Sequence, residues 1–170
     1  MAYTYNGDTR LHYEAHGEGP PLALLMGLGG TVQAWGLQLP TLARRYRVIA
    51  MDNRGAGRSD KPDSDYSIAL FADDLAAVLD AEGIAAAHVL GVSMGGLIAQ
   101  EFHQRHAERT TTLVLGCTGP GVNDPNFVPA PPEIQAVLEM DRRMESAETV
   151  IQAMVEAFYH PHYRERVPDL

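Results

Sequence analysis

The segment Gly91-Val92-Ser93-Met94-Gly95 constrains the fold of this chain more than any other feature. It has the form G-x-S-x-G, follows an apolar run at 88–90, and opens a stretch with helical character. A serine in a sharp turn between a strand and a helix projects out of the sheet, where a base can reach its hydroxyl group. The helix after such a turn passes close to neighbouring strands, so it needs small residues there, which the chain provides as Gly95, Gly96 and Ala99.

Strand and helix patterns alternate on both sides of this unit. A continuous apolar run predicts a strand buried on both faces at 21–26, and further strands are predicted at 46–51, 87–92 and 111–115. Helical spacing predicts helices at 32–45, with a break near Gly36 or Pro40, at 66–82, between Ser67 and Gly83, and at 94–106. This alternation predicts a parallel α/β sheet with right-handed crossovers. Asn6-Gly7, between segments 3–5 and 10–15, predicts an antiparallel hairpin before it.

The last third of the chain has a different character. Glycine, proline and asparagine dominate residues 116–132, which predicts a linker or a long loop. Two helical patterns follow at 133–144 and 147–159, with no strand between them. We therefore expect an α/β core over residues 1–118, and a linker with part of a helical layer over residues 119–170.

Composition excludes several classes of partner. The net charge is −9 and no cluster of lysine and arginine appears, so neither nucleic acid nor an anionic membrane surface is an expected partner. The single cysteine, Cys117, cannot form an internal disulfide. The N-terminal residues lack the pattern of a signal peptide, and the longest apolar stretch, Leu22–Met26, is too short to span a bilayer. These features predict a soluble cytoplasmic protein.

Three motifs each end a predicted strand: Met26-Gly27-Leu28-Gly29-Gly30, the segment Asp52-Asn53-Arg54-Gly55-Ala56-Gly57-Arg58-Ser59, and the serine motif. Together they resemble the α/β-hydrolase superfamily over residues 3–116, in particular its small soluble esterases, enol-lactonases and C–C bond hydrolases. The resemblance implies that Ser93 is the nucleophile and that the backbone N–H groups of Leu28 and Met94 form an oxyanion hole. It also implies that Gly27, Gly29 and Gly30 let the loop approach the substrate and that the Leu28 side chain lines an acyl pocket. Many relatives carry histidine where this chain has Met26.

These residues predict one chemistry. A serine hydroxyl is a weak nucleophile at neutral pH, so Ser93 needs an imidazole that a carboxylate orients. Backbone N–H groups that already point at the reacting carbonyl stabilise the negative oxygen of the intermediate. We therefore expect a hydrolase of carboxylic esters or lactones that works through an acyl-enzyme and requires no cofactor or metal. Serine rather than aspartate at the turn argues against epoxide hydrolase and haloalkane dehalogenase chemistry.

Other polar residues of these motifs have simpler interpretations. We expect Asp52 and Arg54 to be structural, because buried charges are normally paired, rather than a catalytic acid and a substrate clamp. We expect Gly91 and Gly95 to support the turn around Ser93. Dinucleotide binding by the glycine-rich loop is disfavoured, because the fingerprint needs a third glycine where this chain has Val32.

The rest of the triad is not evident. The family order is serine, then aspartate or glutamate, then histidine. The residues after strand 111–115 are Gly116, Cys117 and Thr118, none of them acidic. Asp124 or Asp141, followed by His160 or His162, satisfies the order, but neither histidine follows a predicted strand. For the same two histidines we favour a solvated loop over a metal site, because no third ligand is evident. We expect His88 at the far end of its strand from Ser93, and His103 and His106 on the surface.

Three arrangements could therefore complete the site: further residues of a longer hydrolase, a complementary C-terminal chain, or an unusual closure of the fold. Strand 111–115 would be an open sheet edge, which invites pairing with such a chain or with a second copy. The alternative hypothesis is a non-catalytic fragment or subunit that acts by pairing with a complementary chain. Cofactor-free haloperoxidase-like or C–C hydrolase activity on the same scaffold is a less favoured hypothesis.

Overall fold

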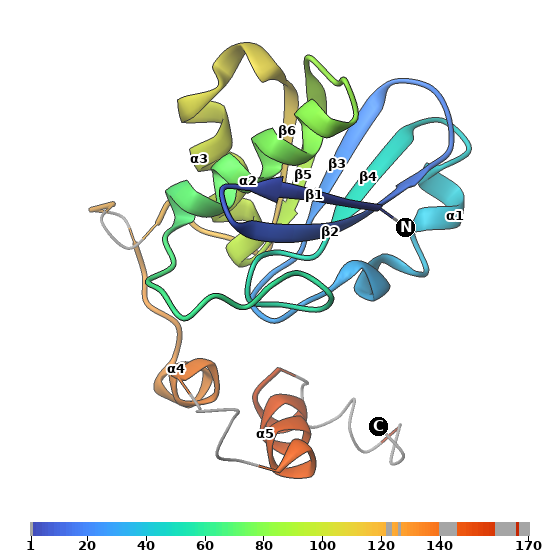
Figure 1. Ribbon diagram of the computed structural model, residues 1–170. Coiled ribbons are helices and arrows are strands. Elements are labelled where there is room, and N and C mark those ends of the chain that lie inside the picture. Colours follow the sequence, from blue (N-terminus) through green and yellow to red (C-terminus); the bar gives the residue numbers. More distant parts are fainter. Residues whose placement is uncertain (1, 122–123, 126, 140–145, 159–165, 167–170) are drawn as a thin grey trace. The chain divides into compact units, whose positions relative to one another are not determined.

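The computed structural model describes residues 2–121, 124–125, 127–139, 146–158 and 166 (Figure 1). The chain divides into two compact units, Met1–Asn123 and Asp124–Leu170. The first unit contains the serine motif and the two other motifs. The core boundary expected at residue 118 stays a prediction.

The first unit is built on a six-stranded sheet with the order β1-β2-β4-β3-β5-β6. Strands β3, β4, β5 and β6 are mutually parallel, whereas β2 pairs antiparallel with both β1 and β4. This confirms the predicted mostly parallel α/β sheet with an N-terminal hairpin. The strands span Ala2–Asn6 (β1), Thr9–His16 (β2), Pro21–Leu25 (β3), Arg47–Met51 (β4), Ala87–Val92 (β5) and Thr110–Gly116 (β6).

The hairpin forms at the predicted dipeptide. Asn6 pairs with Thr9, so Gly7 and Asp8 make a two-residue turn between β1 and β2. Gly7 has φ of 58°, a backbone conformation that glycine adopts without a steric penalty.

Residues 32–45 form two short helical turns separated by the predicted break, and both turns are shorter than the prediction implied. A 3-10 turn, η1 (Val32–Trp35), is followed by one α-helical turn, α1 (Leu39–Leu42). The predicted break lies at Gly36, whose N–H donates to the carbonyl of Gln33 rather than continuing an α-helix. Pro40 does not break a helix, because it lies in the first turn of α1, where its missing N–H has no partner to lose.

The longer helices lie where the sequence predicted them. Helix α2 spans Ile68–Ala81 and α3 spans Met94–Arg105, followed by the 3-10 turn η2 (Ala107–Arg109). Ser67 caps α2, since its hydroxyl oxygen accepts a hydrogen bond from Leu70 N–H at 3.1 Å. Gly83, with φ of 64°, follows the helix and turns the chain toward β5.

The two faces of the sheet carry separate cores. On one face, alternate strand residues such as Leu25, Met51 and Val89 pack with the apolar sides of α2 and α3. On the other, Leu24 and Val48 pack with η1 and α1. Because side chains of a parallel strand alternate between two covered faces, each strand reads as a continuous apolar run. Figure 1 shows the two helical layers on either side of the strands.

Strand β6 is the edge strand of the described sheet. It pairs with β5 on one side, and within residues 2–121 no strand lies along its other side. Val114 and Leu115 are 49% and 45% exposed. The predicted open, apolar edge at 111–115 is therefore present in the described part of the chain.

The second unit contains two helices, α4 (Pro132–Glu139) and α5 (Ala147–Phe158), which contact each other. The helices predicted at 133–144 and 147–159 correspond to them, and the end of each predicted helix lies outside the described residues. Neither these nor the other described helices combine the length and apolar character needed to cross a membrane.

Candidate active site

Ser93 occupies a strained turn between β5 and α3. Its φ of 56° and ψ of −124° lie in a region that residues with a side chain rarely adopt. The turn is held by its backbone: Ser93 N–H donates to the Gly116 carbonyl at 2.9 Å, and Gly96 N–H donates to the Ser93 carbonyl at 2.8 Å. The Ser93 side chain is exposed, and its hydroxyl group makes no capping bond to the helix. The backbone of this turn thus presents the Ser93 hydroxyl group to solvent.

Glycines make this turn sterically feasible. A Cβ atom on Gly91 would lie 2.1 Å from the Gly95 carbonyl oxygen, and one on Gly95 would lie 2.2 Å from the Leu25 carbonyl oxygen. A Cβ on Gly96 would lie 2.5 Å from the side chain of Thr118. The start of α3 therefore passes directly against the ends of β3 and β6, as the small residues of the sequence predicted.

The loop after β3 passes beside Ser93. A Cβ on Gly27 would lie 3.0 Å from Ser93 Cβ and 3.3 Å from Ser93 Oγ, so only a glycine fits without displacing the serine. Gly29 has φ of 70°, and Gly30 N–H donates to the Gly27 carbonyl at 3.0 Å, which closes a tight turn around Leu28. The Leu28 side chain is half exposed.

Two backbone N–H groups near Ser93 are available as donors. Met94 is the first residue of α3, where N–H groups have no acceptor within the helix. Within the described residues, Leu28 N–H has no hydrogen-bond acceptor either. The structure thus leaves both predicted oxyanion donors unused, and their catalytic role stays a prediction.

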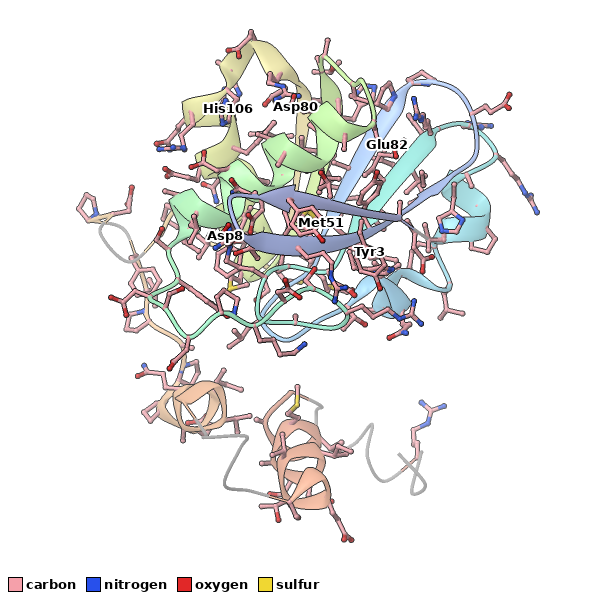
Figure 2. The ribbon with its side chains drawn as sticks, viewed as in Figure 1. Tyr3, Asp8, Met51, Asp80, Glu82 and His106 are labelled. Atoms are coloured by element: carbon pink, nitrogen blue, oxygen red, sulfur yellow. The ribbon has the colours of Figure 1, made fainter. Side chains whose placement is uncertain are left out.

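Asp52 is a buried carboxylate with several donors around it. It follows β4 directly after Met51, which Figure 2 labels, and is 2% exposed. Its Oδ1 accepts from Val32 N–H at 2.7 Å, and its Oδ2 accepts from Arg58 N–H and lies 2.9 Å from His12 Nδ1. Asp52 therefore links the segments that contain Val32, Arg58 and His12, and its buried carboxylate is not open to a substrate.

Arg54 is paired with Asp74 of α2. Arg54 Nε donates to Asp74 Oδ2 at 2.6 Å, a second guanidinium nitrogen donates to the other oxygen, and both side chains are buried. The hydrogen bonds that Arg54 donates to Asp74 raise the pKa of Arg54 above its usual value, against the opposing effect of burial. Sequence reasoning did not find Asp74, although a charge between Phe71 and Leu75 on the apolar side of a helix is a usable signal.

The described histidines lie away from Ser93 or are engaged elsewhere. His88 is five residues before Ser93 along β5, about 16 Å at the rise of a strand. Its Nδ1 lies 2.8 Å from Thr112 Oγ1. His12 is 1% exposed on β2, which lies three strand spacings from β5, or about 14 Å. Neither imidazole can reach the Ser93 hydroxyl.

His103 is exposed, as expected, and His106 is partly exposed. The His106 side chain is 26% exposed, packs on Phe102 with ring centres 5.2 Å apart, and lies 3.5 Å from an Asp73 oxygen. Figure 2 shows it at the end of α3. Helix α3 ends there, and the His106 ring covers Phe102, the last apolar residue of the helix.

No catalytic acid or base is brought to Ser93 by the described part of the first unit. Gly116 ends β6, Cys117 and Thr118 follow it without an acid, and Cys117 is exposed with φ of 50°. Asp124 belongs to the second unit, and Asp141, His160 and His162 lie outside the described residues. Within the described residues, no three histidine, cysteine, aspartate or glutamate side chains gather as metal ligands would.

A strained serine between a parallel strand and a helix, beside a glycine loop from the neighbouring strand, defines a class of hydrolase. Residues 20–163 match the family model described as alpha/beta hydrolase fold, and the chain belongs to this family.

The sequence relatives match a shorter part of this chain than the family model does. The "Putative carbamate hydrolase RutD" of Azorhizobium caulinodans is 42% identical over 115 residues, which are 68% of this chain and 43% of that protein. The protein of the same name from Caulobacter vibrioides is 40% identical over 110 residues, or 62% of this chain and 41% of that protein. The chain therefore spans about two fifths of the length of these relatives.

Solved structures match more of the chain. The structure titled "Est816 as an N-Acyl homoserine lactone degrading enzyme" is 30% identical with a TM-score of 0.80, covering 99% of this chain and 61% of that one. The enol-lactonase from Burkholderia xenovorans LB400 is 29% identical with a TM-score of 0.80, covering 98% and 63%. The esterase RhEst1 from Rhodococcus sp. ECU1013 is 39% identical with a TM-score of 0.65, covering 69% and 45%.

Proposed function

We propose that Ser93 is the nucleophile of a serine hydrolase that acts on carboxylic esters or lactones through an acyl-enzyme. The observation that carries the proposal is the turn at Ser93. Its backbone is strained, its side chain is exposed, and glycines at 91, 95 and 96 exist where no Cβ would fit. Strain of this kind costs on the order of 1–3 kcal/mol and persists where the surrounding structure imposes it. A turn that served only to connect β5 to α3 would not need it.

The reaction follows from the surroundings of Ser93. Its Oγ attacks the acyl carbonyl carbon while a base takes the hydroxyl proton, and the carbonyl oxygen becomes negatively charged. The N–H groups of Leu28 and Met94 donate to that oxygen. The alcohol group leaves with a proton, and water then releases the acid from the acyl-serine. The base and its orienting carboxylate come from outside the described part of the first unit.

The relatives support an acyl carbonyl as the point of attack. Their names and titles include an esterase, an enol-lactonase, an enzyme that degrades an acyl homoserine lactone, and RutD, named for carbamates. Esters, lactones and carbamates share a carbonyl carbon with an oxygen or nitrogen leaving group. The half-exposed, apolar Leu28 beside Ser93 favours an uncharged acyl group.

Hydrolysis of a short-chain p-nitrophenyl ester by the purified chain tests the proposal. We expect Ser93→Ala to reduce turnover to the background rate, and Ser64→Ala, a serine in an exposed loop, to leave it unchanged. Turnover by Ser93→Ala equal to that of the unchanged chain would show that Ser93 is not the nucleophile. No turnover by either protein would favour the second candidate below.

The second candidate is a subunit that needs a complementary chain. The exposed Val114 and Leu115 on β6 favour it, because an unpaired apolar edge is a template for another strand. Size-exclusion chromatography with mass measurement separates the cases. A complex with a smaller chain, or with a second copy, is expected under this hypothesis, whereas a soluble 18.5 kDa monomer with Ser93-dependent turnover would contradict it.

A further inference from the structure

Two adjacent side chains at the end of β4 bind the two ends of the loop after β3. Asn53 Nδ2 donates to the Met26 carbonyl at 3.0 Å, at the start of the loop. Asp52 Oδ1 accepts from Val32 N–H at 2.7 Å, just past its other end. Between these two anchors lie only residues 27–31, which include the N–H group of Leu28.

Both anchors are rigid. Asp52 and Asn53 are each 2% exposed, so water does not compete for these hydrogen bonds. The Asp52 carboxylate accepts from Arg58 N–H and lies beside His12 Nδ1. The backbone N–H of Asp52 donates to the His12 carbonyl. The position of the loop is therefore set by residues at the end of β4, which are held in turn by His12 of β2.

We propose that Asp52 and Asn53 are positioning residues that hold the Leu28 N–H group at the site where the oxyanion forms. This inference rests on the proposed function, since it assigns these residues a role in the same reaction. A donor that is already oriented contributes most when charge develops on the substrate oxygen. A loop released at one end would still admit the substrate but would donate less well in the transition state. Loss of an anchor should therefore lower kcat and leave KM nearly unchanged.

Asn53→Ala is the first variant, because it removes the bond to Met26 and leaves the Asp52 network in place. Asn6→Ala is its control: it removes an equivalent side-chain amide, which donates to Asp74 at 2.8 Å, on a different strand. We expect Asn53→Ala to lower kcat about 10-fold with KM within about twofold, since small misplacements of a catalytic group have effects of that size or larger. Asn6→Ala should leave both constants unchanged.

A second measurement does not need turnover. Gly30 N–H is bonded to Gly27 and Val32 N–H to Asp52, so the hydrogen exchange of both amides reports on the loop. In Asn53→Ala we expect Gly30 N–H to exchange at least about 10-fold faster, while Val32 N–H, which Asp52 still holds, and amides of the buried helix α2, such as Leu75, are unchanged. If Asn53→Ala does not fold, Asn53→Asp, which has the same size and lacks the amide donor, is measured instead.

The outcomes separate the two ideas. Unchanged exchange at Gly30 would overturn the positioning role, with or without turnover. So would an unchanged kcat in Asn53→Ala when Ser93→Ala abolishes turnover. Full turnover by Ser93→Ala would instead overturn the proposed function, and the exchange data would then describe a loop without a catalytic role.

Discussion

The turns after β4 and β5 lie at the ends of strands in one sheet, and they are built in opposite ways. The turn after β5 leaves Ser93 exposed and is shaped by glycines whose missing side chains let backbones touch. The turn after β4 buries Asp52, Asn53 and Arg54 and is shaped by their hydrogen bonds. The first is specified by steric exclusion, whereas the second combines buried polar partners with glycines such as Gly57, where a Cβ would lie 2.3 Å from an Asp52 oxygen.

The difference shows how a serine can be made available. A side chain whose hydrogen bonds were all satisfied within the protein could not react with a substrate, so the Ser93 turn takes its rigidity from the backbone. The turn after β4 has no group to expose, and it uses its side chains to hold its neighbours. We therefore expect the first turn to be damaged by added atoms and the second by lost partners.

The largest effect is expected from the ion pair of the β4 turn. Arg54→Met leaves the fully buried Asp74 without its cation, and removal of one partner of a buried pair costs about 4 kcal/mol of the free energy of unfolding. Arg105→Met, which breaks an exposed pair with Asp73, should cost less than about 1 kcal/mol. Urea unfolding measures both. Equal losses would show that burial does not distinguish the two pairs.

The next effect tests steric exclusion at the β5 turn. Gly91→Ala places a methyl group against the Gly95 carbonyl, and we expect a loss of about 3 kcal/mol from overpacking. Gly116→Ala is a matched control at the end of β6, where the nearest atom to a new Cβ is 3.5 Å away, and it should change stability by less than about 0.5 kcal/mol. A Gly91→Ala protein as stable as Gly116→Ala would refute the steric account.

A smaller effect is expected from another polar contact, the hydrogen bond between β2 and the end of α2. Tyr13 donates to Glu82, labelled in Figure 2, at 2.7 Å, and burial together with this carboxylate raises the pKa of Tyr13 to about 12. Tyr13→Phe should lose about 1.5 kcal/mol near neutral pH. A group with a raised pKa in the folded state contributes fully below its unfolded pKa, near 10, and less as pH approaches 12.

The difference in unfolding free energy between the Tyr13→Phe variant and the unchanged protein should therefore shrink between pH 10 and about 12. The other tyrosines ionise in both proteins and cancel from the comparison. A difference that stays constant, or that grows with pH, would contradict the raised pKa.

The smallest effect has the opposite sign. Ser93→Gly relieves the strained backbone of the β5 turn, and we expect a gain of about 1 kcal/mol after the entropy cost of glycine is subtracted. Ser67→Gly, at a position with φ of −133°, should lose a few tenths of a kcal/mol instead. Thermal unfolding can resolve the two signs. Destabilisation by Ser93→Gly would mean that the turn is not strained.

The sequence was sufficient for features that depend on neighbours along the chain. The hairpin at Asn6-Gly7, the buried strands, the capped helix after Ser67 and the strand–turn–helix unit around Ser93 are all encoded by local residue patterns. The break in the helical segment at 32–45 was also predicted, but its 3-10 geometry was not, because tertiary packing of Val32 and Trp35 against the sheet favours a short 3-10 turn there.

Contacts between distant segments were decided by the tertiary structure alone. Asp52 and Asn53 gain their partners Val32 and Met26 only because parallel strands end at the same edge of the sheet. Arg54 and Asp74 of α2 are 20 residues apart in the sequence, and they too are brought together only by the tertiary structure. A pattern within one segment reports the periodicity of that segment, whereas a hydrogen bond between segments depends on how the whole sheet brings them together. That is why the turn at Ser93 and a structural role for Asp52 could be predicted from the sequence, whereas the partners that Asp52 and Asn53 bind in the neighbouring loop could not.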